Sequence, residues 1–216
     1  MTESYFAGVT CAALDMIGVL VLEDKLISKG FVEHFGDRLA LPITEIKDRY
    51  DAGFARGGLT RDQFWEGVLE GDWRRAEEEF LATRNFAPQA REVIAQLSAC
   101  VAVAVISDMP RDWATALLKR HGVTPLLSGA VFSSDGVGSK KDGGLFDALC
   151  EAVKRPAQQI LLVDDRVSNV ERATARGMRA MWLPLDSDEE QSPDVHRLSN
   201  LFDLPGLLGC SNSATR

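Results

Sequence analysis

Five short apolar segments constrain the fold of this chain more than any other feature of its sequence. Most are rich in Val and Ile and lack alternation with polar residues, which is typical of strands covered on both faces in a parallel sheet. Amphipathic helical patterns separate them, and this alternation predicts an α/β fold with a doubly wound, Rossmann-like parallel sheet. The segments are VTCAALD near residue 9, VAVAVIS from Val101, GAVFSS from Gly129, ILLVDD from Ile160 and AMWLPL from Ala180.

The stretch from Leu22 to Asn85 contains no strand-like segment. It consists of amphipathic helical patterns separated by Gly, Pro and Thr, which commonly end helices. We therefore predict an α/β core formed by residues 1–21 and 86–216, with an all-helical cap, residues 22–85, inserted after the first strand. The acidic and polar tail after Asp186 is expected to fray.

Composition and charge exclude some classes of partner. The 216 residues carry a net charge of −8, whereas a nucleic-acid surface needs clustered Lys and Arg. No apolar run is long enough to span a bilayer and no targeting signal is evident, so we expect a soluble cytoplasmic protein that binds neither nucleic acid nor membrane. The sequence does not indicate an oligomeric state. The four cysteines form no C-x-x-C pair, and we expect reduced, mostly buried thiols.

Polar residues end three of the predicted strands. Asp15 follows the first, Ser107 and Asp108 end the second, and Asp164 and Asp165 end the fourth. Ligands of open parallel sheets bind at the carboxyl ends of the strands, so these side chains are expected to converge. Each alone has a structural explanation, since Asp and Ser commonly cap helices or begin turns. Their shared place at one edge of one sheet favours a functional site.

This constellation, in this order, resembles the motifs of the haloacid dehalogenase (HAD) superfamily. The resemblance extends over residues 11–182, most of the chain, and the helical insertion matches the cap that many members carry after the first strand. The nucleophile and the second, third and fourth motifs fall, in that order, on Asp15 of LDMIGVL, Ser107 of VAVISD, Lys140 of GSKKDGGLF, and the pair Asp164 and Asp165 of LLVDDRVSN. Lys140 has a structural alternative as well, a solvated pair with Lys141.

The resemblance implies phosphoryl transfer by these side chains. Asp15 would attack a phosphoryl group and form an aspartyl-phosphate that water later hydrolyses. Ser107 would donate a hydrogen bond to a phosphoryl oxygen, and Asp108 would lie beside the bound substrate. Lys140 would add a positive charge that is most valuable as the transition state forms. The cap would close over the site, exclude water and select the leaving group.

The resemblance also implies a magnesium site. Asp15, Asp164 and Asp165 are hard oxygen donors suited to Mg²⁺, and the backbone carbonyl of Ile17 would complete the protein ligands. The ion would reduce the repulsion between Asp15 and the phosphate that it attacks. Because haloacid dehalogenases themselves manage without a metal, the Asp164–Asp165 pair favours a phosphatase.

Two positions depart from the family pattern. Many HAD phosphatases carry a second Asp two residues after the nucleophile, where it protonates the leaving oxygen; this chain has Ile17. One branch also lacks that acid, and GVL here, with the segment DAGFARGGLTRDQFWEGV, looks like that branch, some of whose members cleave sugar 1-phosphates. Asp108 stands where Asn is common, and a carboxylate beside phosphate is unfavourable unless it is protonated, paired or turned away. A sharper hypothesis is that Asp108 supplies the missing acid.

The leading interpretation is a Mg²⁺-dependent phosphatase acting on a small phosphorylated metabolite such as a sugar phosphate. The alternatives are a weak or inactive HAD-fold protein that binds a phosphorylated ligand or partner, which Ile17 and Asp108 favour, and a metal-independent dehalogenase. Several residues of the predicted cap could reach a substrate, although most are expected on solvated helix faces: Arg49, Tyr50, Arg56, Arg74 and Arg75. Trp65 and Trp73 are expected in the core of the cap.

Overall fold

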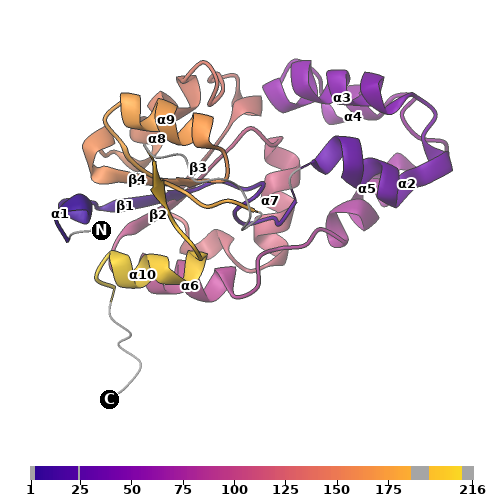
Figure 1. The fold of residues 1–216 in the computed structure, drawn as a ribbon. Helices are drawn as coiled ribbons and strands as arrows, with labels where there is room; N and C mark the ends of the chain where they lie inside the picture. Colours follow the sequence, from indigo (N-terminus) through magenta and orange to yellow (C-terminus); the bar gives the residue numbers. More distant parts are fainter. Residues whose placement is uncertain (1–2, 24, 186–194, 211–216) are drawn as a thin grey trace.

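A computed structural model describes residues 3–23, 25–185 and 195–210 of the chain. Its centre is a parallel sheet of six strands in the order β3-β2-β1-β4-β5-β6 (Figure 1). The strands are β1 (Cys11–Leu14), β2 (Ala102–Ser107), β3 (Gly129–Phe132), β4 (Ile160–Asp164), β5 (Arg179–Trp182) and β6 (His196–Arg197). The five predicted strands and the α/β parallel fold are confirmed.

Helices cover both faces of the sheet, which explains the unbroken apolar strands. Ala12 and Leu14 of β1 belong to one core cluster, while Cys11 and Ala13 belong to the other, as the two-residue period of a strand requires. Figure 1 shows α8 and α9 on one side of the sheet and α6 and α10 on the other. The helices of this core are α6 (Ala90–Ser98), α7 (Arg111–Arg120), α8 (Gly144–Val153), α9 (Val167–Ala175) and α10 (Leu204–Leu207).

The order of the strands reverses at β1, which pairs with β2 on one side and β4 on the other. Such a reversal opens a crevice at the carboxyl ends of the strands, where open α/β sheets bind their ligands. Leu14, the last residue of β1, pairs in register with Val163 of β4. Asp15 and Asp164 therefore leave the sheet side by side.

A helical segment, residues 26–82, lies between β1 and β2 and is called the helical cap below (Figure 1). Its two ends meet, because Leu22 N donates to Asn85 O at 2.8 Å and Ala87 N donates to Leu20 O at 2.7 Å. The insertion after the first strand is thus confirmed, and its limits at 22 and 85 stay a prediction. Its elements are the π-helix η1 (Leu26–Phe31), α2 (Val32–Phe35), η2 (Gly36–Arg38), α3 (Ile43–Ala52), η3 (Phe54–Arg56), α4 (Arg61–Trp65) and α5 (Trp73–Ala82).

The segment after Asp186 differs in part from the expected fraying tail. Residues 186–194 and 211–216 lie outside the described part, but residues 195–210 form β6 and α10 against the core. The remaining short elements are α1 (Glu3–Phe6), η4 (Thr124–Leu126), η5 (Ser133–Asp135), η6 (Ala157–Gln159) and η7 (Leu201–Asp203).

The expectation of four reduced thiols is wrong for one pair. Cys100 and Cys210 form a disulfide, with a Cα–Cα distance of 5.9 Å, whereas Cys11 and Cys150 are free. The two bonded residues are 110 positions apart in the sequence, and they meet only because α10 packs against α6. Among the described helices, none combines the length and apolar character that a bilayer span requires.

Candidate active site

Three carboxylates meet at the carboxyl end of the sheet. Asp15 directly follows β1, Asp164 is the last residue of β4, and Asp165 comes next. One oxygen from each of them lies within 4.8 Å of the others. Asp15 and Asp164 are buried and Asp165 is half-buried, so their mutual repulsion is poorly screened by water.

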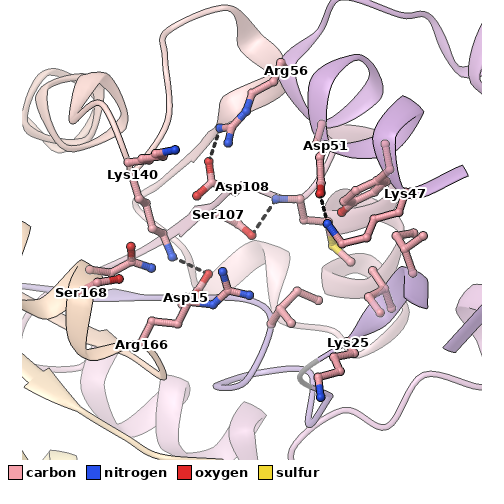
Figure 2. A pocket seen from close by; sticks show the side chains of 18 of the residues that line it. Asp15, Lys25, Lys47, Asp51, Arg56, Ser107, Asp108, Lys140, Arg166 and Ser168 are labelled. Atoms are coloured by element: carbon pink, nitrogen blue, oxygen red, sulfur yellow. Dashed lines mark hydrogen bonds and ion pairs between the residues drawn. The ribbon is translucent and has the colours of Figure 1, made fainter. Parts of the chain in front are cut away.

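Lys140 holds two of these carboxylates together. Its Nζ lies 2.7 Å from Asp15 Oδ1, as Figure 2 shows. It also lies 2.7 Å from Asp164 Oδ2, and the residue is 1% exposed. Burial opposes the charged ammonium, but the two carboxylates raise the pKa of Lys140 above its usual value. Lys140 is therefore not part of a solvated pair with Lys141, which is exposed.

Asp164 and Asp165 differ in how they are held. Asp164 Oδ1 accepts hydrogen bonds of 2.9 Å from Arg166 N and from Asn169 Nδ2, which fixes the orientation of the carboxylate. Asp165 Oδ1 is buried, and no group in the described part of the chain donates to it. The Asp165 side chain also packs against the backbone of Gly18, where a Cβ atom would overlap its carboxyl group.

The electrostatics of the cluster favour a bound cation. Burial, with the repulsion of Asp164, raises the pKa of Asp165 to about 7. Burial also raises the pKa of Asp15 well above its usual range, although Lys140 opposes this shift. A divalent ion would relieve the repulsion and give the orphaned oxygen of Asp165 a partner. These residues therefore fit Mg²⁺.

Ser107 and Asp108 lie at the end of β2, as predicted. Ser107 Oγ accepts a hydrogen bond of 3.0 Å from Met109 N, and its own proton remains available to a ligand. Asp108 Oδ1 accepts a hydrogen bond of 2.6 Å from Arg56 Nη1 of the helical cap (Figure 2). The charge of Asp108 is thus compensated by an ion pair. Pairing is one of the conditions under which a carboxylate can lie beside a bound phosphate.

These side chains face a cavity of about 470 Å³ between the sheet edge and the helical cap. This volume is typical of sites for small molecules. Asp15, Ser107, Asp108 and Lys140 line it, and so does Ile17 in the place of the usual acid. The cap contributes apolar, polar and charged residues to the walls, and Lys25 lines the cavity just before the cap begins. The cap residues are Leu26, Ile27, Ser28, Lys47, Tyr50, Asp51, Ala55 and Arg56.

Of the cap residues that the sequence analysis named as possible substrate contacts, some line the cavity and others do not. Tyr50 and Arg56 line the cavity. Arg49 instead donates to the backbone carbonyl of Glu66, and Arg74 and Arg75 border a different cavity. Trp65 is buried, and its ring lies parallel to that of Trp73 with the centroids 6.0 Å apart, which places both in the packing of the cap as expected.

Sequence reasoning missed part of the site. Asn169 orients Asp164, although the sequence did not single it out as a site residue. Its place in the first turns of the helix after the Asp pair was the available signal. Other residues that the sequence did not propose as contacts line the cavity from the loop after β3 and from the region of α9, and three of them lie inside the quoted motifs: Lys141, Arg166, Ser168 and Arg172.

Comparisons with known proteins give the same fold. A family model described as haloacid dehalogenase-like hydrolase matches residues 9–175. A HAD phosphatase from Thermococcus onnurineus is 16% identical with a TM-score of 0.69, over 93% of this chain and 98% of that chain. L-2-haloacid dehalogenase from Xanthobacter autotrophicus is 16% identical with a TM-score of 0.66, over the same shares of the two chains.

A third similar structure holds ligands. It is the HAD family enzyme bt-2542 from Bacteroides thetaiotaomicron in complex with magnesium and inorganic phosphate, 15% identical with a TM-score of 0.70 over 84% of this chain and 98% of that chain. None of the curated protein sequences matches significantly. The family model covers most of the chain, and the six-stranded sheet with its cap agrees with it. The chain therefore belongs to the haloacid dehalogenase-like hydrolases.

Proposed function

We propose that this hydrolase is a Mg²⁺-dependent phosphatase that cleaves a small phosphate monoester, such as a sugar phosphate, through an aspartyl-phosphate on Asp15. The observation that carries the proposal is the cluster of Asp15, Asp164 and Asp165 around a buried Lys140. Three carboxylates against one lysine leave an excess of negative charge, which a dianionic phosphate would meet unfavourably without a cation. Mg²⁺ would supply that charge and draw electron density from the phosphoryl oxygens.

The residues of the chain divide the chemistry between them. Within the described part of the chain, the hydrogen bonds to Asp15 come from Met16 N and Lys140 Nζ and both go to Oδ1, so Oδ2 is the oxygen left for attack on phosphorus. Lys140 favours the ionised form that a nucleophile needs and stabilises charge on the phosphoryl group. Ser107 donates a hydrogen bond from its hydroxyl group to a phosphoryl oxygen. Water then hydrolyses the acyl phosphate, which releases phosphate and restores Asp15.

The departure of the leaving group is the weak step. Ile17 lines the cavity, and its hydrocarbon side chain has no acidic proton to donate. Asp108, the alternative donor, accepts a hydrogen bond from Arg56 in its ion pair instead of donating one. The leaving oxygen therefore departs as an anion or takes its proton from solvent, and the enzyme is expected to favour phosphates with acidic leaving groups.

Hydrolysis of phenyl phosphate, measured with Mg²⁺ and with a chelator, tests the proposal. Activity with Mg²⁺ only is expected, and Asp15→Asn should reduce it to background because the amide does not attack phosphorus. Metal-dependent turnover that survives in Asp15→Asn would exclude the covalent mechanism. Absence of turnover together with Mg²⁺ binding would favour a binding protein of this fold, and halide release from a 2-haloacid would favour a dehalogenase.

A cytoplasmic location remains a proposal from the sequence. Fractionation of the cells that produce the protein would test it.

A further inference from the structure

The cavity is positively charged although the chain as a whole is acidic. Seven cationic residues line it against three carboxylates, while the net charge of the chain is −8. Lys140 is already engaged by Asp15 and Asp164. The other cations of the lining come from the residue before the cap, from the cap, from the loop after β3 and from the region of α9: Lys25, Lys47, Arg56, Lys141, Arg166 and Arg172. Lys47 is paired with Asp51 and Arg56 with Asp108, both of which are among the three carboxylates counted above. The lining therefore carries more positive charge than is needed to bind one phosphoryl group whose charge is also compensated by Mg²⁺.

Arg56 is the cap cation whose position is best fixed. The residue before it, Ala55, accepts a hydrogen bond through its carbonyl from Ser133 Oγ of the core. The residue after it, Gly57, approaches the Ser134 carbonyl so closely that a Cβ atom would overlap it. Core contacts on both sides of Arg56 thus hold this part of the cap against η5, and a side chain on a fixed backbone loses less entropy when it binds a ligand.

The guanidinium of Arg56 is also oriented towards the site. One N–H is donated to Asp108 at 2.6 Å, which leaves other donors of the planar group for a ligand. Figure 2 shows Arg56 entering from the cap, with Asp108 and Ser107 between its guanidinium and Asp15. In an in-line displacement, the leaving group lies on the side of phosphorus opposite Asp15. The leaving group would therefore extend towards Arg56.

We infer that the leaving group of the substrate carries a second anionic group, a carboxylate or a further phosphate, and that Arg56 binds it. The inference rests on the phosphatase function proposed above and adds the substrate class. It also accounts for Asp108, because the Asn common at this position in the family offers Arg56 no ion pair. The hydrocarbon part of such a leaving group would contact Leu26, Ile27 and Met109 of the cavity.

Two simpler explanations make different predictions. If the Arg56–Asp108 pair only fastens the cap to the core, a charge on the leaving group should not affect binding. If the cations only steer anions by long-range attraction, removal of a positive charge outside the cavity should also have an effect. A matched pair of ligands and a matched control variant separate these cases from direct binding.

The probes are 4-carboxybenzylphosphonate and its neutral counterpart 4-carbamoylbenzylphosphonate, which resist hydrolysis and have nearly the same shape. Their dissociation constants are measured by calorimetry in Mg²⁺ buffer for wild type, Arg56→Gln and Arg56→Lys. The double variant Arg56→Gln/Asp108→Asn replaces the ion pair by two amides, so no unpaired carboxylate remains. Lys119→Gln is the control, since Lys119 lies in the last turn of α7 and does not line the cavity.

Wild type should bind the carboxylate at least about tenfold more tightly than the amide, as expected for a charge-assisted hydrogen bond. The ratio should fall to about one in Arg56→Gln and in the double variant, should recover in part in Arg56→Lys, and should stay unchanged in Lys119→Gln. A variant that changes the binding of the phosphonate group changes the affinity of both ligands equally. The ratio of the two dissociation constants therefore reports only on the carboxylate or carbamoyl group.

Equal affinities in wild type, or no binding of either ligand, would overturn the inference. So would a preference that survives in both variants lacking the arginine, or one that Lys119→Gln reduces as much as Arg56→Gln does. Hydrolysis of phenyl phosphate, which has no second anionic group, tests the phosphatase function separately. Preference for the carboxylate without any hydrolysis would retain the anion site and reject the catalytic proposal.

Discussion

The carboxylate of Glu77 in α5 of the cap accepts a hydrogen bond from the indole N–H of Trp113 in α7 of the core. Glu77 is 0% exposed and also accepts from Trp65 Nε1 at 2.7 Å and from Arg61. A buried charge needs such partners, because an isolated carboxylate would be costly to remove from water. The cap is therefore tied to the core by a polar contact inside a cluster of aromatic rings.

Glu77→Ala should destabilise the protein by roughly 1–3 kcal/mol for each indole that loses its acceptor. Urea unfolding followed by tryptophan fluorescence measures the change. Glu78→Ala is the matched control, since Glu78 is the exposed neighbour on the same helix. Similar stability of the two variants would show that the buried carboxylate contributes no net stabilisation.

Asp164→Asn should weaken Mg²⁺ binding by roughly tenfold or more, because the change removes one formal charge from a hard-oxygen site. Calorimetric titration with Mg²⁺ measures the affinity, and circular dichroism checks that the fold is retained. Asp147→Asn, on an exposed position of α8, controls for the loss of one charge elsewhere. Unchanged affinity in Asp164→Asn would remove Asp164 from the metal site.

Gly18→Ala should impair metal binding without any change in the ligands themselves. The backbone φ of Gly18 is +85°, and the added methyl group would displace the carboxyl group of Asp165. Gly8→Ala is a close control, since Gly8 has φ +79° and no atom within 4 Å of the added Cβ. Both variants carry the cost of a left-handed residue, about 1–2 kcal/mol, but only Gly18→Ala should lower the Mg²⁺ affinity. Equal affinities would contradict the packing argument.

Ile17→Asp should reduce the dependence of the rate on leaving-group pKa. A positioned acid contributes about 10²–10⁴-fold, so wild type should hydrolyse aryl phosphates much faster than alkyl phosphates. Rates for a graded phosphate series measure the slope in both proteins, with melting temperatures as a control for the buried charge. A flat dependence in wild type, with chemistry rate-limiting, would mean that another group supplies the proton. Asp108→Asn should then steepen it.

Reduction of the Cys100–Cys210 disulfide should destabilise the protein by roughly 2–4 kcal/mol, because the bond closes a long loop in the unfolded chain. Urea unfolding with and without dithiothreitol measures the difference. Cys100→Ser should be insensitive to the reductant and should match reduced wild type, whereas Cys150→Ser should respond like wild type. If reductant changes nothing in wild type, the two thiols are not bonded in solution.

The sequence predicted the sheet well because its strands are apolar on both faces, a pattern that few other structures produce. β6 was missed because His196 and Arg197, its two residues, are polar and add to the edge of a sheet that the other strands had already formed. The disulfide was missed for a related reason, since its cysteines meet only through the packing of two helices.

In the candidate site, too, some features follow from local sequence patterns and others depend on tertiary packing. Asp15 and Asp164 end adjacent strands, so topology alone brings them together, and their convergence could be predicted. The ion pair between Arg56 and Asp108 depends on how the cap docks, which no local pattern encodes. Sequence reasoning could name Arg56 as a candidate but could not distinguish it from Arg49, Arg74 or Arg75, because all four belong to amphipathic patterns of the cap.

The hydrogen bond between Leu22 and Asn85, which joins the two ends of the cap, would make it easy to exchange one cap for another. Because the two ends of the cap already meet, a replacement of any length between them has little loop-closure entropy to overcome, and the strands that carry Asp15 and Ser107 need not move. A recombination event or an engineered graft could thus exchange the whole recognition unit in one step while leaving the reactive groups in place. Trp113, a core residue that packs among the aromatic rings of the cap, is one of the positions that would have to change with it.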